Sequence, residues 1–186
     1  MSFLIGCDNE SRTGSLPQSD SAVEEDPPKA DTNRQQTAES GSTQSSSVKP
    51  SSKDDPLSAK LSVLNPSVQV GESFELSVVL TIERGYEIHD REVSPPFFPT
   101  KLELELPQEF ECVGDWQAPD PIRSAKPTGG RVYVGKVIFK QQICVSKSAA
   151  PGTHLLSCKV SYQACDAVRC LSPIDSELSI VVPVVP

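Results

Sequence analysis

The chain has six cysteines, and their chemistry says more about its function than that of any other residue type. Two of them, Cys165 and Cys170, stand close together in the segment SYQACDAVRCLSP. They follow one apolar segment and precede another, so a hairpin would bring their Cα atoms within the about 4.4–6.8 Å that a disulfide requires. Exposed disulfides that close short loops are open to attack by a thiolate. The residues alone leave two interpretations equally open, a structural staple of the hairpin and a redox-active pair.

Alternation of apolar and polar residues predicts the strands that would position this pair. The alternation or apolar character covers residues 57–63, 74–82, 102–106, 132–145, 153–163 and 174–185. Period-two patterns of this length are typical of half-buried strands, and Pro- and Gly-containing turns separate them. No window of comparable length has a helical period. The predicted fold is therefore all-β, an immunoglobulin-like antiparallel β-sandwich over residues 57–186.

Strand parity, meaning whether a residue lies on the same face as the apolar residues of its strand, predicts the environment of three other cysteines. Cys158 shares the parity of the apolar residues in its strand and is expected to be a small buried hydrophobe. Cys144 has the opposite parity to its apolar neighbours. If the SAAPGT turn joins these two strands in a hairpin, Cys144 and Cys158 point to opposite faces and do not readily bond to each other. Cys112 shares the parity of Phe110 and is expected in the core.

The N-terminal part of the chain predicts a tether. Residues 1–7, MSFLIGC, end in LIGC, which resembles the lipobox of bacterial lipoproteins and implies lipidation of Cys7, with part of the signal peptide lying upstream of this start. The alternative is an accidental match in a frayed cytosolic N-terminus. Residues 8–56 are rich in Ser, Gln, Pro and acidic residues. Such a segment buries too little apolar surface to offset the backbone entropy, about 1–2 kcal/mol per residue, and is predicted to be a disordered linker.

Composition and spacing argue against several other classes of function. The net charge is −8, and neither half of the chain has the basic patch expected of a nucleic-acid-binding protein. No apolar stretch approaches the about 20 residues that span a bilayer, so membrane contact is expected only through a lipid anchor. His89 and His154 are not spaced from cysteines as zinc ligands are. No metal and no bound cofactor is expected.

Several segments resemble one known family over residues 57–186. They are GYEIHD at 85–90, PTKLELELPQEFE at 99–111, VGKVIFKQQICV at 134–145, PGTHLLSCKVSYQAC at 151–165 and CLSP at 170–173. The region resembles the N-terminal, periplasmic, immunoglobulin-like domain of the thiol:disulfide interchange protein DsbD, the disulfide bond corrector family. The most specific element is a strand ending in Tyr-Gln-x-Cys, followed by a short loop and a second Cys close to a Pro.

The resemblance implies a redox function at the cysteine pair. Cys165 and Cys170 match the family's redox pair, with Cys170 entering the mixed disulfide and Cys165 acting as the resolving thiol. Tyr133 matches an aromatic cap over the disulfide. Glu87 and His89 stand where better-known members have tyrosines. The domain would pass reducing equivalents between thioredoxin-like proteins on the periplasmic side of a bacterial membrane, without a bound cofactor.

The resemblance also implies a particular architecture. DsbD proteins continue into a membrane-spanning electron carrier and a thioredoxin domain, whereas this sequence matches only the first domain. It would then act as a stand-alone, lipid-anchored domain whose electron donor is another polypeptide in the membrane, and as one component of a protein-disulfide reductase system. The alternative is a non-enzymatic β-sandwich that serves as a binding or scaffold module, with the same bond as a structural disulfide.

Overall fold

The computed structural model describes residues 44–48, 55–126 and 129–186, and every regular element in them is a β-strand. The strands are β1 (Gln44–Val48), β2 (Leu57–Val63), β3 (Val68–Gln69), β4 (Ser73–Ile82), β5 (Glu87–His89), β6 (Lys101–Glu105), β7 (Phe110–Gln117), β8 (Ile122–Arg123), β9 (Arg131–Tyr133), β10 (Lys136–Val145), β11 (Gly152–Tyr162), β12 (Ala164–Cys165) and β13 (Ile174–Val185). The predicted lipobox with Cys7, and most of the predicted linker, lie outside the described residues.

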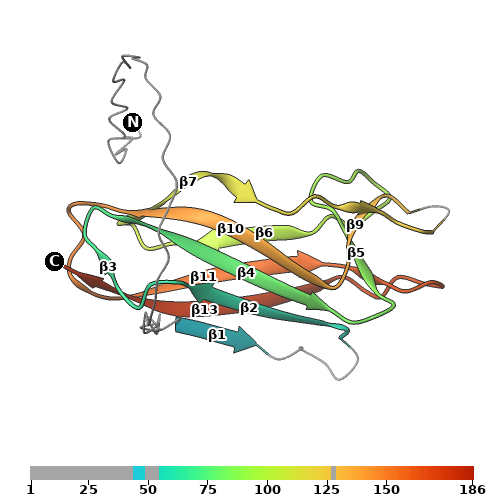
Figure 1. Cartoon of the computed structure of the whole chain (residues 1–186), viewed down its shortest axis with the longest axis horizontal. Helices are drawn as coiled ribbons and strands as arrows, with labels where there is room; N and C mark the ends of the chain where they lie inside the picture. Colours follow the sequence, from blue (N-terminus) through green and yellow to red (C-terminus); the bar gives the residue numbers. More distant parts are fainter. Residues whose placement is uncertain (1–43, 49–54, 127–128) are drawn as a thin grey trace, which may run out of the picture. The chain divides into compact units, whose positions relative to one another are not determined.

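Two large sheets form the body of a sandwich. The first has the order β1-β2-β4-β10-β7, and the second has the order β3-β13-β11-β6. All pairs are antiparallel except β3 with β13, which is parallel. A small third sheet, β12-β5-β9-β8, is called the end sheet here. In Figure 1, β5 and β9 lie at one end of the sandwich, and β3 and the C-terminus lie at the other.

The core follows the predicted alternation. Along β2 and β4 every second side chain is buried, and β13 shows the same pattern over most of its length. The buried faces of the two large sheets meet in one apolar cluster. Each fully buried Leu, Ile, Val or Phe in such a cluster contributes about 1.5–3 kcal/mol relative to leaving it exposed. The prediction of an all-β immunoglobulin-like sandwich is confirmed.

The predicted hairpin between the strands that carry Cys144 and Cys158 is wrong. β10 pairs with β4 and β7 in the first sheet, whereas β11 pairs with β13 and β6 in the second. The turn between β10 and β11 therefore crosses from one sheet to the other. Cys158 is buried as expected, and burial raises the pKa of its thiol to about 12. Cys144 is buried as well.

Cys112 is exposed, in contrast to the expected core position. It lies on β7, an edge strand in which only Phe110 is buried. The pairing of β7 with β10 shifts register between Lys140 and Gln142. This shift lies beyond Cys112, because Phe110 and Cys112 pair with Val145 and Ile143 in unbroken register. Cys112 therefore keeps the parity of Phe110 and is nevertheless exposed, at the edge of the first sheet.

Part of the segment predicted as linker takes part in the fold. Strand β1 pairs antiparallel with β2 along the edge of the first sheet. Backbone hydrogen bonds alone can hold such an edge strand, so apolar composition does not reveal it. Asp55 is also buried, where its carboxylate accepts hydrogen bonds from the Tyr162 hydroxyl (2.6 Å) and the Leu57 backbone N–H (3.1 Å). The folded region therefore includes Asp55, just before the predicted boundary.

Among the residues that the structure describes, none belongs to a helix able to span a membrane.

Candidate functional site

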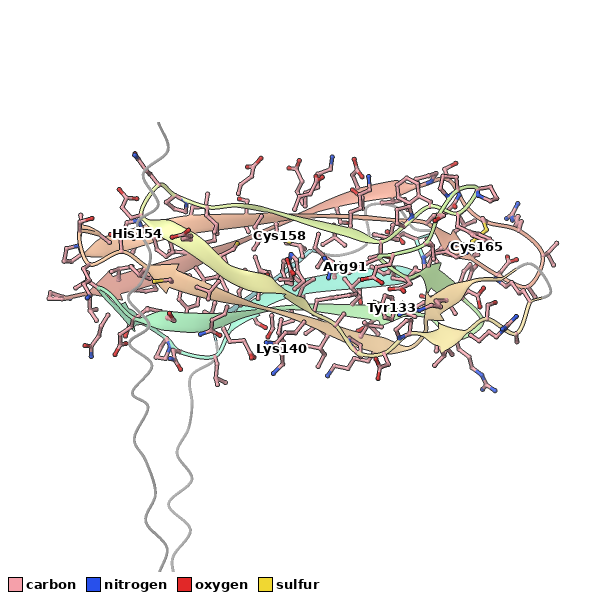
Figure 2. All side chains as sticks on the ribbon, turned by 90° about the horizontal axis from the view of Figure 1, so that it is seen from above. Arg91, Tyr133, Lys140, His154, Cys158 and Cys165 are labelled. Carbon is pink, nitrogen blue, oxygen red and sulfur yellow. A yellow bond between two sulfur atoms is a disulfide. The ribbon has the colours of Figure 1, made fainter. Side chains whose placement is uncertain are left out.

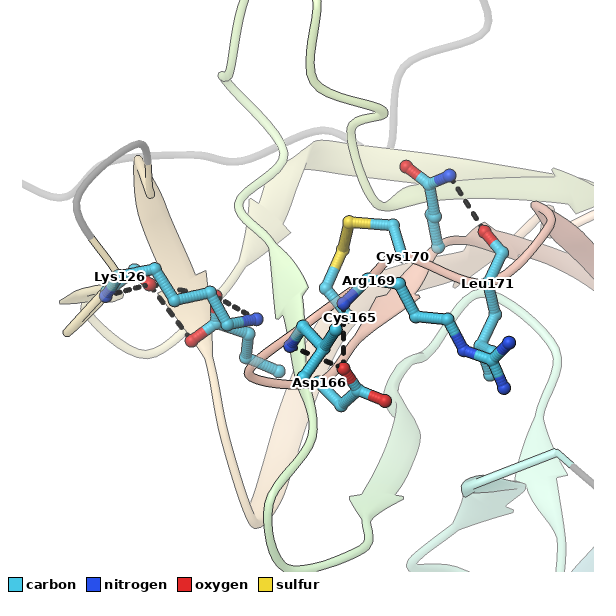
Figure 3. Close-up of a disulfide and its surroundings, with 10 residues drawn as sticks. Lys126, Cys165, Asp166, Arg169, Cys170 and Leu171 are labelled. Carbon is cyan, nitrogen blue, oxygen red and sulfur yellow. Dashed lines mark hydrogen bonds and ion pairs between the residues drawn. A yellow bond between two sulfur atoms is a disulfide. The ribbon is translucent and has the colours of Figure 1, made fainter.

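A disulfide joins Cys165 and Cys170 at the tip of a narrow hairpin. Cys165 ends β12, and Cys170 forms an isolated antiparallel bridge with it. The Cα–Cα distance is 3.9 Å, just below the range expected from sequence. The Leu171 N–H donates to the Ala164 carbonyl at 2.8 Å, and the Gln163 side chain donates to the Leu171 carbonyl at 2.8 Å (Figure 3). These bonds continue the hairpin behind the disulfide and fix the two cysteines opposite each other.

Asp166 organises the turn between the two cysteines. Its carboxylate accepts hydrogen bonds from the backbone N–H groups of Val168 (2.7 Å) and Arg169 (2.8 Å), and its own N–H donates to the Arg169 carbonyl (2.9 Å). The bonds from Arg169 and Val168 lower the pKa of Asp166, because they favour its charged form. An Asp at this position is a common way to close a tight turn.

The two sulfur-bearing residues differ sharply in exposure. Cys165 is 2% exposed, whereas Cys170 is exposed on the same hairpin. Val168, in the turn just before Cys170, is 92% exposed. Cys170 is therefore the more accessible residue of the pair.

The end sheet sets the surroundings of Cys165. In its register Cys165 pairs with Glu87, Ala164 pairs with Ile88, and Ile88 pairs with Tyr133. Paired residues of antiparallel strands lie on the same face of a sheet, and neighbouring residues alternate between faces. Ala164, Ile88 and Tyr133 therefore face the apolar core, and all three belong to the core cluster. Cys165 and Glu87 lie on the opposite face.

The role of Tyr133 as a cap over the disulfide stays a prediction. Its side chain is buried in the core, where its ring meets Phe139 edge-on at 5.4 Å. Its hydroxyl donates to the Asp90 carboxylate at 2.9 Å, and burial together with this bond raises the pKa of Tyr133. Figure 2 places Tyr133 at the same end of the molecule as Cys165. The register nevertheless puts the two side chains on opposite faces of the end sheet.

Glu87 is held beside the disulfide by two partners from the β8–β9 connection. The Lys126 ammonium lies 2.9 Å from its carboxylate, and the Ser124 hydroxyl donates to both carboxylate oxygens at 2.8 and 3.1 Å. Figure 3 shows Lys126 among the surroundings of the disulfide. The sequence comparison had pointed to Glu87 only as a departure from the family pattern, and it gave no sign of Ser124 or Lys126.

His89 belongs to a buried polar group on the same strand as Glu87. Its ring lies 4.6 Å from the Phe97 ring, and its backbone carbonyl accepts a hydrogen bond from the Thr100 hydroxyl at 2.6 Å. Burial lowers the pKa of His89, and the nearby Glu87 carboxylate partly offsets this effect. The His89 Nδ1 atom has no hydrogen-bond partner among the described residues.

The described residues contain no group of three or more His, Cys, Asp or Glu side chains arranged to hold a metal ion. Cys7, the predicted lipidation site, lies outside the described residues.

Comparison with solved structures gives distant relatives of the fold. The chain is similar to the N-terminal periplasmic domain of ScsB from Proteus mirabilis (11% identity, TM-score 0.49, 77% of this chain and 52% of that chain). It is also similar to the GAE domain of GGA2p from Saccharomyces cerevisiae (10% identity, TM-score 0.43, 75% and 97%). A third similar structure is the DsbD N-terminal domain of Neisseria meningitidis in its reduced form (17% identity, TM-score 0.37, 58% and 77%).

These likenesses include the N-terminal domains of ScsB and DsbD at low identity, and this chain spans about half the length of the ScsB structure. No family model matches the sequence, and no curated protein matches it.

Proposed function

We propose that this chain is a thiol–disulfide exchange module that passes reducing equivalents between thioredoxin-like proteins outside the cytosol. The observation that carries the proposal is the asymmetric disulfide, with Cys170 exposed and Cys165 covered. Exchange requires that one sulfur be open to a partner and that the other remain close enough to act as the resolving thiol. The hairpin meets both conditions.

The exchange proceeds in two steps. The thiolate of a reduced partner attacks the Cys170 sulfur, a mixed disulfide forms, and the Cys165–Cys170 bond breaks with its electron pair on the Cys165 sulfur. A second thiolate of that partner then attacks its own sulfur in the mixed disulfide and releases Cys170. The partner is oxidised by two electrons, and both cysteines gain one proton each. The reverse sequence passes the electrons to the next partner, and Cys165 resolves that mixed disulfide.

A purely structural staple explains the disulfide less well. The bond closes a loop of only a few residues. Chain-entropy arguments give such a loop about 2 kcal/mol of stabilisation, compared with about 4.7 kcal/mol for a loop of 100 residues. The hairpin is also held without the bond, by Asp166 within the turn and by Leu171 and Gln163 behind it.

The proposed location is the periplasmic side of a bacterial membrane, with a lipid on Cys7 and a membrane electron donor as one partner. The LIGC segment and the polar linker after it support this part of the proposal. Expression of an upstream-extended gene with labelled fatty acid should label the protein, and a Cys7→Ser variant should not be labelled.

The reduction potential of the pair tests the proposed function. Structural disulfides in secreted proteins generally lie below about −300 mV, and exchange-active ones lie above it. We expect a value above this limit, measured by equilibration with glutathione or thioredoxin. A value well below it would favour the scaffold module with a structural disulfide.

Trapping of the mixed disulfide tests the roles of the two cysteines. A Cys165→Ser variant lacks the resolving thiol and should accumulate a covalent complex with a thioredoxin-fold partner through Cys170. A Cys170→Ser variant should trap little, because its remaining thiol is covered. Equal trapping by the two variants would contradict the assigned roles.

A further inference from the structure

A charged residue, Glu87, is the cross-strand neighbour of the covered cysteine. Glu87 is the direct antiparallel partner of Cys165. Directly paired side chains in an antiparallel ladder have Cβ atoms about 4.5–5.5 Å apart on one face of the sheet. Cys170 pairs with Cys165 from the other side, so the disulfide and the Glu87 side chain share this face of the sheet. The covered cysteine therefore has a charged residue as its direct cross-strand partner.

The carboxylate is held in place and partly shielded from water. The side chains of Glu87 and Lys126 are only 12% and 24% exposed, and the ion pair between them is 2.9 Å long. The Lys126 N–H donates to the Ser124 hydroxyl at 3.1 Å, and that hydroxyl donates to Glu87. The Gly129 N–H donates to the Lys126 carbonyl at 3.0 Å.

Gly129 allows this loop to close on Ser124. A Cβ atom at Gly129 would lie 2.2 Å from the side chain of Ser124, a distance that real Cβ atoms do not show. Any other residue would displace the hydroxyl that orients the Glu87 carboxylate. The Ser124, Lys126 and Glu87 side chains thus form one unit, defined here as the Glu87 cluster.

Opening of the disulfide places a new charge next to this cluster. Attack on the exposed Cys170 sulfur leaves the electron pair, and hence a negative charge, on Cys165. A neighbouring carboxylate disfavours this charge, and a neighbouring ammonium favours it. Both interactions are stronger at a site that is largely shielded from water than between exposed groups.

We propose that Glu87 and Lys126 are positioning residues that control the charge on the Cys165 sulfur, and through it the rate at which a thiol opens the disulfide. The Glu87 carboxylate slows the opening, and Lys126 counteracts it. The inference deepens the proposed function, because it assigns the regulation of the same site. A small thiol can test it, so its outcome does not depend on a protein partner.

Other charged groups near Cys165 contribute less to this balance. Asp166 and Arg169 lie in the hairpin turn, where solvent screens them. Asp166 is also engaged by two backbone N–H groups. His89 lies on the same face of β5 as Glu87, but burial lowers the pKa of its ring and so disfavours a charge there.

The test compares opposite changes of charge at the Glu87 cluster. We measure the second-order rate of reduction by dithiothreitol at pH 7 for Glu87→Gln and Lys126→Met. Glu87→Gln should accelerate reduction by roughly threefold to tenfold, because a lower thiol pKa makes the Cys165 sulfur a better leaving group. Lys126→Met should slow reduction by a similar factor. The matched control is Glu103→Gln, an exposed carboxylate on β6 in the second sheet, which should leave the rate unchanged.

Two further measurements separate charge from structural damage. Glu87→Asp keeps the charge and should react at a rate closer to the unmodified chain than Glu87→Gln does. In a Cys170→Ser background, the pKa of the Cys165 thiol, followed by NMR of labelled cysteine, should fall in Glu87→Gln and rise in Lys126→Met. Changes of the same sign in Glu87→Gln and Lys126→Met, in the reduction rate or in the pKa of the Cys165 thiol, would overturn the inference. A change in rate no larger than that of the Glu103→Gln control would also overturn it. A reduction potential of the cysteine pair below about −300 mV would contradict the proposed function. The rates of reduction by dithiothreitol would still test the role of the Glu87 cluster.

Discussion

The sandwich body and the end sheet are held together in different ways. In the body, long strands such as β4 and β13 bury every second side chain in one apolar cluster. In the end sheet the strands are only two or three residues long. Several buried polar residues gather in and around it, namely His89, Asp90, Thr100 and Ser124. The body is stabilised mainly by apolar burial, and the end sheet depends on particular polar contacts.

The difference bears on how the end sheet holds the Cys165–Cys170 disulfide. Burial of apolar surface produces a close-packed core, so the body provides a rigid support. Polar contacts are directional and set the charge at particular atoms. The end sheet therefore holds Cys165 buried, with Glu87 as its cross-strand partner, while Cys170 is exposed. Four predictions follow this contrast, beginning with the body.

The largest loss of stability is expected for Phe139→Ala. The Phe139 side chain is fully buried on β10 and supports the Tyr133 ring. Its removal should cost about 3–5 kcal/mol of unfolding free energy, measured with denaturant. The matched control is Ile138→Ala. Ile138 directly precedes Phe139 on the strand and its side chain is partly exposed, so its removal should cost clearly less unfolding free energy. A cost below about 1 kcal/mol for Phe139→Ala would contradict the assigned role of the body.

A smaller loss, confined to the end sheet, is expected for Asp90→Ala. The change removes the acceptor for the Tyr133 hydroxyl and the ion pair with Arg131 (3.1 Å). An unsatisfied buried hydroxyl should cost about 1–3 kcal/mol. Tyr133→Phe should cost less, because no buried donor is left without a partner. Amide hydrogen exchange should speed up in β5 and β9 before it does in β4. Equal acceleration in both sheets would show that the two regions unfold as one unit.

Alkaline pH should weaken both regions through two buried tyrosines. The pKa values of Tyr133 and Tyr162 are raised, first by burial and then by hydrogen bonds to Asp90 and Asp55. The unfolded chain loses these protons near pH 10, so their contribution to stability is complete below that pH and is lost as the pH rises further. Denaturant unfolding at pH 8 to 11 should show this decline. Tyr133→Phe and Tyr162→Phe should each make the decline shallower, and an unchanged slope would contradict the burial of the hydroxyls.

The smallest effect on stability is expected for Val168→Ser at the hairpin tip. Val168 is almost fully exposed, so unfolding free energy should change by less than about 0.5 kcal/mol. Reduction by dithiothreitol should be unchanged, whereas exchange with a thioredoxin-fold protein should slow several-fold, because that partner has to cover the tip to reach Cys170. Leu155→Ser, an exposed apolar residue on β11, is the control. Equal effects of the two variants on protein exchange would argue against contact at the tip.

The same contrast explains what could be predicted from the sequence. The strands of the body were predicted because period two persists over many residues, and the Cys165–Cys170 bond because its residues are close along the chain. The end sheet gave no such signal, since a strand of two residues has no period. The contacts of Glu87 with Lys126 and of Asp90 with Tyr133 join residues about 40 apart in sequence. The buried side chain of Tyr133 depends on the pairing of β9 with β5, and Cys112 lies on β7 at a sheet edge. Parity within one strand reveals neither.

The position of β13 has a consequence for how the domain folds during synthesis. This last strand of the chain is an interior strand of the second sheet, where it pairs with β11 on one side and with β3 on the other. As the chain emerges from its N-terminus, that sheet cannot close until the final residues are free. Folding is therefore delayed until the whole domain has emerged, and the many long-range pairings place it among slow, millisecond-to-second folders. The Cys165–Cys170 bond needs only local chain closure, so it can form before the sandwich does.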